Sequence, residues 1–293
     1  VACPTNCGAG RNSTGGGAVR IRAGGVVTVN GTISCDAGKA NNPTGAGGSI
    51  WLTGSDLAGS GTVQARGGAA NSIYTPDGCG GRIAIYLTEA TSFANWEAGG
   101  GKLYACAQSS NGGAGTIYKQ AAGQTRETAT LIVDGNNVAA DGSFVELGAK
   151  TDSSVIGNLI VRNKGHIQVI AGETVTIHGD LSTASDSYYD SATALVPGAT
   201  LVFAGSGVST ITGNAKLPNV TCTTPGKVLR FGTGANDLFR VLDGATVKSG
   251  DAVCVVEAMK LFNPIKATAA GKITFLVEHG KPVQKGQVLA TIA

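Results

Sequence analysis

Charged and aromatic residues are scarce in this chain, and the scarcity excludes whole classes of protein. Only 14% of the 293 residues are charged, against about a quarter in ordinary soluble domains, and 5% are aromatic. A helical bundle needs many charged helix formers, and each of the 46 glycines would cost about 1 kcal/mol inside a helix. The composition therefore excludes a bundle and favours many short strands joined by glycine-rich turns.

Basic clusters, long apolar runs and a starting methionine are missing as well. The net charge is +3 and the lysines and arginines are scattered, so no basic stripe predicts nucleic-acid binding. No apolar run reaches the roughly 18 residues that a membrane-spanning helix needs, so no transmembrane segment is predicted. The chain begins with Val1 and has no signal-peptide pattern, so we expect either a processed chain or a fragment.

The seven cysteines contain no Cys-x-x-Cys pair, so no zinc site is predicted. Five of the seven lie in the first 106 residues, within or beside glycine-rich loops. If the chain is extracellular, we expect disulfides among four of them: Cys3, Cys7, Cys35 and Cys79. No Gly-x-Ser-x-Gly motif or phosphate-binding loop is present, and no catalytic residue is predicted.

The first 120 residues carry a repeat in which glycines precede an alternating apolar strand. The unit occurs at 16–21, 47–52, 80–85 and, more weakly, 113–118. A second unit, Gly-Thr-(Ile/Val), occurs at 31–33 and 61–63. Periods near 30 residues indicate stacked coils of chain, and the paired glycines suit corners that need positive φ or close backbone approach.

Residues 125–230 keep the strand character with a different rhythm. Segments 200–207, 210–213, 217–220 and 227–232 resemble the strand-repeat regions of large bacterial surface proteins. That resemblance implies a right-handed parallel β-helix over residues 1–235, displayed or secreted outside the cell. A pair of glycine-rich β-sandwiches is the alternative.

The last part of the chain, 236–293, differs in composition and contains an internal duplication. Residues 244–251 recur as 280–287, and each copy leads into an apolar strand. Two similar halves of this kind predict a small β-sandwich with pseudo-two-fold symmetry. Between the halves lies Glu257-Ala258-Met259-Lys260, which holds the only methionine of the chain and is flanked by apolar runs.

This segment resembles the biotinyl carrier domain of biotin-dependent carboxylases, a flattened β-barrel fold that lipoyl domains share. The resemblance implies that Lys260 carries covalent biotin and that Glu257, Ala258 and Met259 are read by a biotin ligase. It also implies a biotin carboxylase and a carboxyltransferase as partners, and a carrier subunit without catalytic residues of its own. The family opens with an Ala-Pro-Met-x-Gly-like strand, which we do not find. Residues 228–234 stand in that place, so either they serve as the first strand or the carrier domain is incomplete.

Three hypotheses about the whole chain therefore stay open. The chain is a biotin carboxyl carrier fused to a β-solenoid, or an extracellular structural or adhesive solenoid that self-associates into fibres, with the C-terminal module as a cap. The third hypothesis is a composite or engineered chain joined near 233–237. The localisation stays open too, because the solenoid part predicts the cell surface and the carrier part predicts the cytoplasm.

Overall fold

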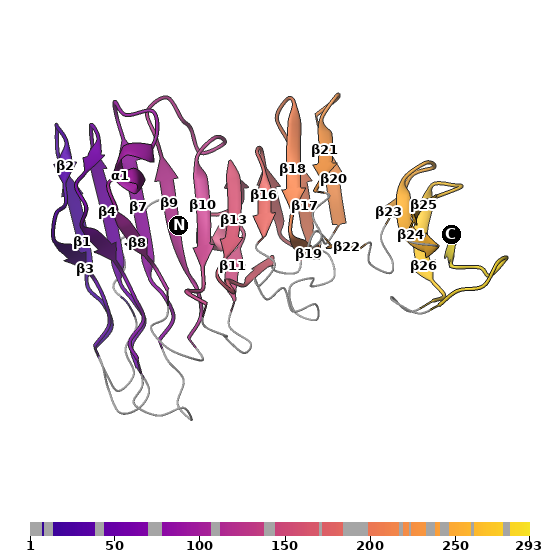
Figure 1. Ribbon diagram of the computed structural model, residues 1–293, viewed down its shortest axis with the longest axis horizontal. Helices are drawn as coiled ribbons and strands as arrows, with labels where there is room; N and C mark the ends of the chain where they lie inside the picture. Colours follow the sequence, from indigo (N-terminus) through magenta and orange to yellow (C-terminus); the bar gives the residue numbers. More distant parts are fainter. Residues whose placement is uncertain are drawn as a thin grey trace.

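The chain is mostly β-structure. The computed structural model describes residues 8, 14–38, 44–69, 78–106, 112–137, 144–169, 172–183, 199–216, 219–222, 224–232, 238–240, 246–258, 261–277 and 282–293 (Figure 1). Helix is confined, within these residues, to the five-residue α1 (Ala94–Ala98) and the 3-10 turn η1 (Ala149–Thr151). No described helix has the length and apolar character needed to cross a membrane.

Nine strands form the largest sheet. In order across the sheet they are β1 (Ala18–Arg22), β4 (Ser49–Gly54), β7 (Arg82–Leu87), β9 (Gly115–Gln120), β10 (Thr130–Asp134), β13 (Asn158–Arg162), β16 (Leu181–Thr183), β18 (Val208–Thr212) and β21 (Val228–Phe231).

Smaller parallel sheets accompany it. They are formed by β2 (Val27–Thr28) with β5 (Leu57–Ala58); by β3 (Thr32–Ser34), β6 (Thr62–Gln64) and β8 (Lys102–Tyr104); by β11 (Val145–Leu147) with β14 (Ile167–Val169); by β12 (Val155–Ile156), β15 (Thr174–Ile177), β17 (Thr200–Phe203) and β20 (Asn219–Cys222); and by β19 (Asn214–Lys216) with β22 (Leu238–Arg240).

The sequence repeat sets the register of the first strands. Ala18 of β1 pairs with Ser49 of β4, which pairs with Arg82 of β7, which pairs with Thr116 of β9, all in parallel. The first two steps, of 31 and 33 residues, equal the spacings of the glycine repeat, and the third, of 34 residues, exceeds the repeat spacing by one. The second repeat unit likewise places Thr32 of β3 opposite Thr62 of β6. Each of the first two repeats therefore supplies one strand to each of three sheets.

Close approach of neighbouring backbone segments explains the paired glycines. A Cβ added to Gly48 would lie 1.8 Å from the carbonyl oxygen of Gly17, and one added to Gly81 would lie 2.1 Å from that of Gly48. Neither Gly48 nor Gly81 has positive φ. A Cβ on Gly17, in the first coil, would meet nothing within 4 Å. Of the two reasons predicted for these glycines, close approach of the backbones is the one that applies at Gly48 and Gly81.

An antiparallel step interrupts the parallel series. β9 and β10 form a hairpin in which Ile117 lies opposite Ile132, so the nine-stranded sheet is mixed. From β10 onward the strands again pair in parallel with their successors. The structure thus confirms a mostly β chain with extensive parallel sheets, and this one antiparallel step departs from the parallel pairing expected of a β-helix.

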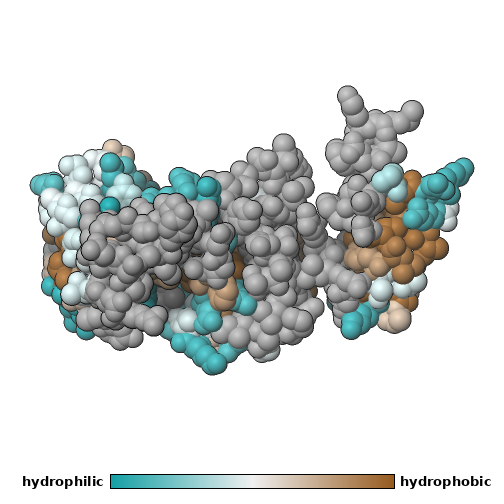
Figure 2. All heavy atoms as spheres, turned by 90° about the horizontal axis from the view of Figure 1, so that it is seen from below, coloured by the Kyte–Doolittle hydropathy of each residue, from teal (hydrophilic) through white to brown (hydrophobic). Residues whose placement is uncertain are grey.

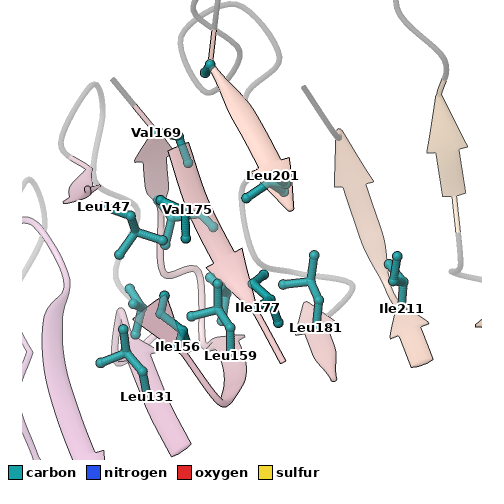
Figure 3. Close-up of a cluster of buried hydrophobic side chains, with 14 of the residues drawn as sticks. Leu131, Leu147, Ile156, Leu159, Val169, Val175, Ile177, Leu181, Leu201 and Ile211 are labelled. Carbon is teal, nitrogen blue, oxygen red and sulfur yellow. The ribbon is translucent and has the colours of Figure 1, made fainter. Parts of the chain in front are cut away.

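Two large hydrophobic cores share the strands on either side of that step, one mainly from earlier strands and one mainly from later strands. One contains the fully buried side chains of β4, β7 and β9, including Ile50, Ile83 and Ile117, together with Trp96 of α1. The other joins later strands and is drawn in Figure 3, where Leu159, Ile177 and Leu181 point toward a shared interior. Buried positions alternate along β13 and most of β4, as a sheet with one inward face requires, whereas β7, β9 and β10 bury three or more consecutive residues.

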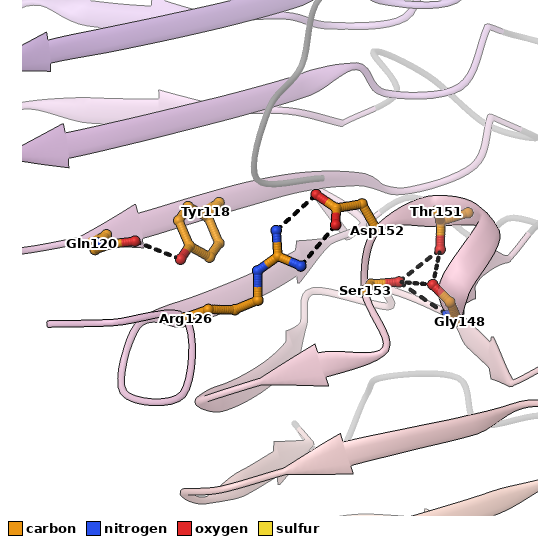
Figure 4. Close-up of polar contacts among 7 residues, drawn as sticks. All are labelled: Tyr118, Gln120, Arg126, Gly148, Thr151, Asp152 and Ser153. Carbon is orange, nitrogen blue, oxygen red and sulfur yellow. Dashed lines mark hydrogen bonds and ion pairs between the residues drawn. The ribbon is translucent and has the colours of Figure 1, made fainter.

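Polar contacts tie the hairpin to the coil that follows it (Figure 4). Arg126, in the turn between β9 and β10, forms a two-pronged ion pair with Asp152, with N–O distances of 2.7 and 2.9 Å. Asp152 follows η1 and adopts left-handed backbone, with φ of 54°. Ser153 Oγ accepts a hydrogen bond from the Gly148 amide at 3.1 Å. The Ser153 bond satisfies the backbone amide of Gly148, and the ion pair joins side chains of the two turns.

Five strands at the C-terminal end form two further sheets. They are β23 (Thr246–Val247), β24 (Ala252–Ala258), β25 (Leu261–Lys266), β26 (Gly271–Phe275) and β27 (Ala290–Ile292). β26 pairs in antiparallel fashion with β23 on one side and β27 on the other, while β24 pairs with β25. Figure 1 shows them gathered beyond β21 at one end of the long axis.

Candidate functional site

The hairpin of β24 and β25 carries the predicted site. Ala258 pairs with Leu261, and Glu257 pairs with Phe262. Between the paired ends stand two residues of sequence, Met259 and Lys260, which lie outside the described residues. Glu257 and Ala258 are the last backbone positions of β24. The local register thus brings the strand ends together on either side of the predicted lysine.

Turn chemistry does not explain the sequence at this connection. Two-residue hairpin connections favour Asn-Gly, Asp-Gly or a leading Gly, because these residues tolerate positive φ. Met259-Lys260 contains none of them, although the rest of the hairpin follows ordinary strand composition. Places where local sequence breaks such a rule are enriched in functional sites, so a functional reason for the Met-Lys pair is favoured.

A small core lies beneath the hairpin. Val253 is a bulge residue between paired Ala252 and Cys254, and its side chain is 7% exposed. It packs with Val247, Ala267 and the fully buried Ile273, and Phe275 and Ile292 are among the half-buried side chains around them. Burial also raises the pKa of the half-buried Cys254 thiol.

The internal duplication appears as two matching turns. In the first, the Lys248 amide donates to Asp251 Oδ2 at 2.7 Å, and Gly250 has φ of 94°. In the second, the Gln284 amide donates to Gln287 Oε1 at 2.9 Å, and Gly286 has φ of 86°. The side chains of Asp251 and Gln287 therefore cap equivalent turns. The two aligned copies of the duplication contain these residues at matching positions, but the sequence alone did not predict their capping role.

The segment expected to replace the family's first strand has another partner here. Residues Val228–Phe231 form β21, which pairs in parallel with β18 of the nine-stranded sheet. Among the residues that the structure describes, the C-terminal sheets contain only the five strands β23 to β27.

The structure tests only some of the predicted disulfides. Cys3 and Cys7 lie outside the described residues. Cys35 is buried and Cys79 is exposed, and no disulfide joins these two. Pairings that involve Cys3 or Cys7 stay predictions. The described ranges also contain no group of three or more His, Cys, Asp or Glu side chains that could hold a metal ion.

Comparison with known proteins identifies the C-terminal part. Residues 219–292 match the model of the family described as biotin-requiring enzyme. The match reaches back well beyond the boundary at 236 that the sequence predicts, and it includes β20 to β22. No solved structure matches the chain.

Three curated relatives each match 50 to 53 residues of this chain. The biotin carboxyl carrier protein of acetyl-CoA carboxylase from Pseudomonas aeruginosa is 52% identical over 50 residues, 17% of this chain and 32% of that protein. The protein of the same name from Nostoc is 44% identical over 50 residues, 28% of its length. The biotin-dependent acyl-coenzyme A carboxylase alpha3 subunit of Mycobacterium leprae is 51% identical over 53 residues, 9% of its length.

The matched segment spans less than a third of the length of each of these relatives. The segment that the family model matches, residues 219–292, contains the β24–β25 hairpin and both of the duplicated turns. The C-terminal part of this chain, residues 219–292, is therefore a biotin/lipoyl domain of the biotin carboxyl carrier type.

Proposed function

We propose that Lys260 is the residue that carries covalent biotin and that the C-terminal domain serves as a carboxyl carrier. One observation carries the proposal: the sequence Glu257-Ala258-Met259-Lys260 falls at the connection of two paired strands, inside a segment that matches biotin-requiring enzymes. A lysine amine at the end of a four-carbon stem suits attachment of a cofactor that must reach other active sites.

The residues present fit such a group. A carrier needs a primary amine for the amide bond and a rigid support, and the hairpin with its core of Val253 and Ile273 supplies the support. Biotin, when attached, supplies the carboxyl-carrying chemistry, and the protein supplies the tether. Glu257, Ala258 and Met259 are the residues that a biotin ligase would recognise.

The partners follow from the same proposal. A carrier domain visits a biotin carboxylase, where the carboxyl group is loaded, and a carboxyltransferase, where it is delivered. The printed names of the relatives, acetyl-CoA carboxylase and acyl-coenzyme A carboxylase, support this class of partner. The chain then acts as a carrier subunit.

For residues 1–235 we propose a right-handed β-solenoid that serves as a scaffold for the carrier domain at 236–293. Strands recurring about every 30 residues in parallel sheets support it. Parallel strands of one sheet are joined by right-handed crossovers in about 98% of cases, which supports the handedness. A structural or adhesive role at the cell surface stays a prediction. So does a composite chain joined near 233–237, residues outside the described part.

Intact mass spectrometry tests the carrier proposal. The full chain is co-expressed with a biotin ligase, and we expect a mass increase of one attached biotin that maps to the peptide containing Lys260. Lys260→Arg should abolish the increase. Lys266→Arg, at an exposed lysine of the same hairpin, should leave it unchanged. Unmodified wild-type chain, under conditions that label a known carrier domain, would contradict the proposal.

A further inference from the structure

Three strands lie together at one end of the parallel sheets. β1, β2 and β3 each stand at the edge of their sheet and pair, among the described strands, with β4, β5 and β6 respectively. Figure 1 shows the three at the left end of the long axis. We call residues 17–34, which contain these strands, the end face. An open edge of this kind is a template on which a further strand can add.

The inward side chains of the end face are only half-buried: Val19, Ile21, Val27 and Ile33. Their register partners one repeat later are at most 1% exposed: Ile50, Leu52, Leu57 and Val63. The paired side chains are chemically alike, but β4 and β6 have a paired strand on both sides. Val26, beside β2, is 54% exposed, and Figure 2 shows hydrophobic atoms reaching the surface at this end of the molecule. The end face therefore presents part of a core to solvent.

Two glycines of the end face match those that the next repeat needs for close packing. A Cβ on Gly48 would lie 1.8 Å from the Gly17 carbonyl oxygen, and one on Gly61 would lie 2.3 Å from that of Gly31. Gly17 and Gly31 occupy the same repeat positions, but a Cβ on either would meet nothing within 4 Å, and neither has positive φ. Glycine at both positions suits a further backbone that approaches from the open side.

The charge of the end face selects the kind of partner. Arg20 and Arg22 are its only charged residues in sequence, and both are exposed. They alternate with Val19 and Ile21, so they lie on the outward side of β1, and neither takes part in an ion pair among the described residues. Two copies of the chain joined through β1 would gather four arginines, which like-charge repulsion disfavours. A strand with acidic outward side chains would meet them favourably.

We propose that the end face binds an extended segment of a partner protein, which adds to β1 as a further strand and whose side chains alternate between aliphatic and acidic. The aliphatic side chains cover Val19 and Ile21 from the side opposite β4, and the acidic side chains lie beside Arg20 and Arg22. Backbone hydrogen bonds supply the affinity, and the alternation supplies the specificity. Biotin takes no part, so this proposal and the carrier proposal stand or fail separately.

Peptide binding to the full-length chain, followed by fluorescence anisotropy, tests the proposal. The probe is a labelled peptide of about nine residues, within the usual length of a strand, in which valine alternates with glutamate. We expect it to bind at least about tenfold more tightly than a valine–lysine peptide, because its charges oppose those of Arg20 and Arg22. A serine–glutamate peptide should also bind at least about tenfold more weakly, because it has no aliphatic side. No saturable binding of the valine–glutamate peptide, or equal binding of the three, would overturn the proposal.

Gly17→Val separates docking from folding. The added side chain meets nothing in this chain but lies where the partner backbone approaches. The variant should unfold at the wild-type temperature and bind the valine–glutamate peptide at least about tenfold more weakly. Thr174→Val, at an exposed position of β15 between two paired strands, is the control and should bind as the wild type does. Wild-type binding by Gly17→Val would contradict the proposed position of the added strand.

Sedimentation velocity tests the other occupant, a second copy of this chain. We expect the wild type and Gly17→Val to sediment alike over the same concentrations, because the arginines of β1 disfavour pairing of copies. A self-association that Gly17→Val abolishes would show that a second copy occupies the end face, and it would overturn the proposal of an acidic partner.

Discussion

Replacing Ile273 by alanine is expected to stop biotin attachment, although Ile273 lies on β26 and not on the β24–β25 hairpin. Its side chain is fully buried at the centre of the small C-terminal core, in contact with the cluster that contains Val253 of the hairpin. A ligase that reads a lysine presented by a folded hairpin should lose its substrate when that core collapses.

The magnitude follows from the size of the domain. Truncating a fully buried isoleucine to alanine costs about 2–5 kcal/mol, and more when the cavity cannot close. Folded domains are stable by about 0.05–0.15 kcal/mol per residue, so the carrier domain proposed for residues 236–293 holds about 3–9 kcal/mol. The loss is therefore comparable to the whole stability of the C-terminal domain, and a large fraction of molecules should be unfolded there.

The assay compares two isoleucine variants of the full chain, each incubated with biotin ligase, ATP and biotin, with labelling followed by a streptavidin gel shift. Ile273→Ala should label at a small fraction of the wild-type rate. Ile83→Ala is the matched control, because Ile83 is also fully buried but lies in β7. It should lower the thermal stability of the parallel sheets and leave labelling unchanged. Wild-type labelling of Ile273→Ala, or loss of labelling in Ile83→Ala, would refute the reasoning.

Three further predictions concern the parallel sheets. Gly48→Ala should destabilise the N-terminal part by about 1–3 kcal/mol in thermal unfolding, because its Cβ would overlap a neighbouring carbonyl. Gly17→Ala, whose Cβ would meet nothing, should change the stability by less than about 0.5 kcal/mol. Equal effects of the two variants would contradict the close-approach explanation. Arg126→Ala should lower the free energy of unfolding by no more than about 1 kcal/mol in the same measurement, because both partners of its ion pair are over a third exposed. A much larger loss of stability would contradict the weak contribution expected of an exposed ion pair. Burial raises the pKa of Cys106 from 9.0 to about 12, so a thiol reagent at pH 8 should modify the exposed Cys79 much faster than Cys106 in the native chain. Because the folded pKa is the higher one, Cys106 contributes stability that is present below pH 9 and lost as the pH rises toward 12, and Cys106→Ala should remove that part of the alkaline loss.

The sequence by itself determined the strand content, the spacing of the first coils and the place of the carrier motif. The repeat is a local signal in the sequence. It consists of glycines at 47–48 and 80–81 with alternating apolar residues after them, and its spacing fixes which residues can lie in register. The duplicated turns around Gly250 and Gly286 are equally local, since each turn is closed by a residue three positions away.

Only the tertiary structure decided which strands pair where the repeat gives no guidance. The antiparallel pairing of β9 with β10, the lack of a disulfide between Cys35 and Cys79 and the placement of β21 beside β18 are not marked by any spacing in the sequence. An alternating apolar strand fits the edge of many sheets equally well, and the choice depends on the packing of neighbours that the strand itself does not encode. For that reason residues 228–231 match two patterns in sequence and have one observed partner in the fold.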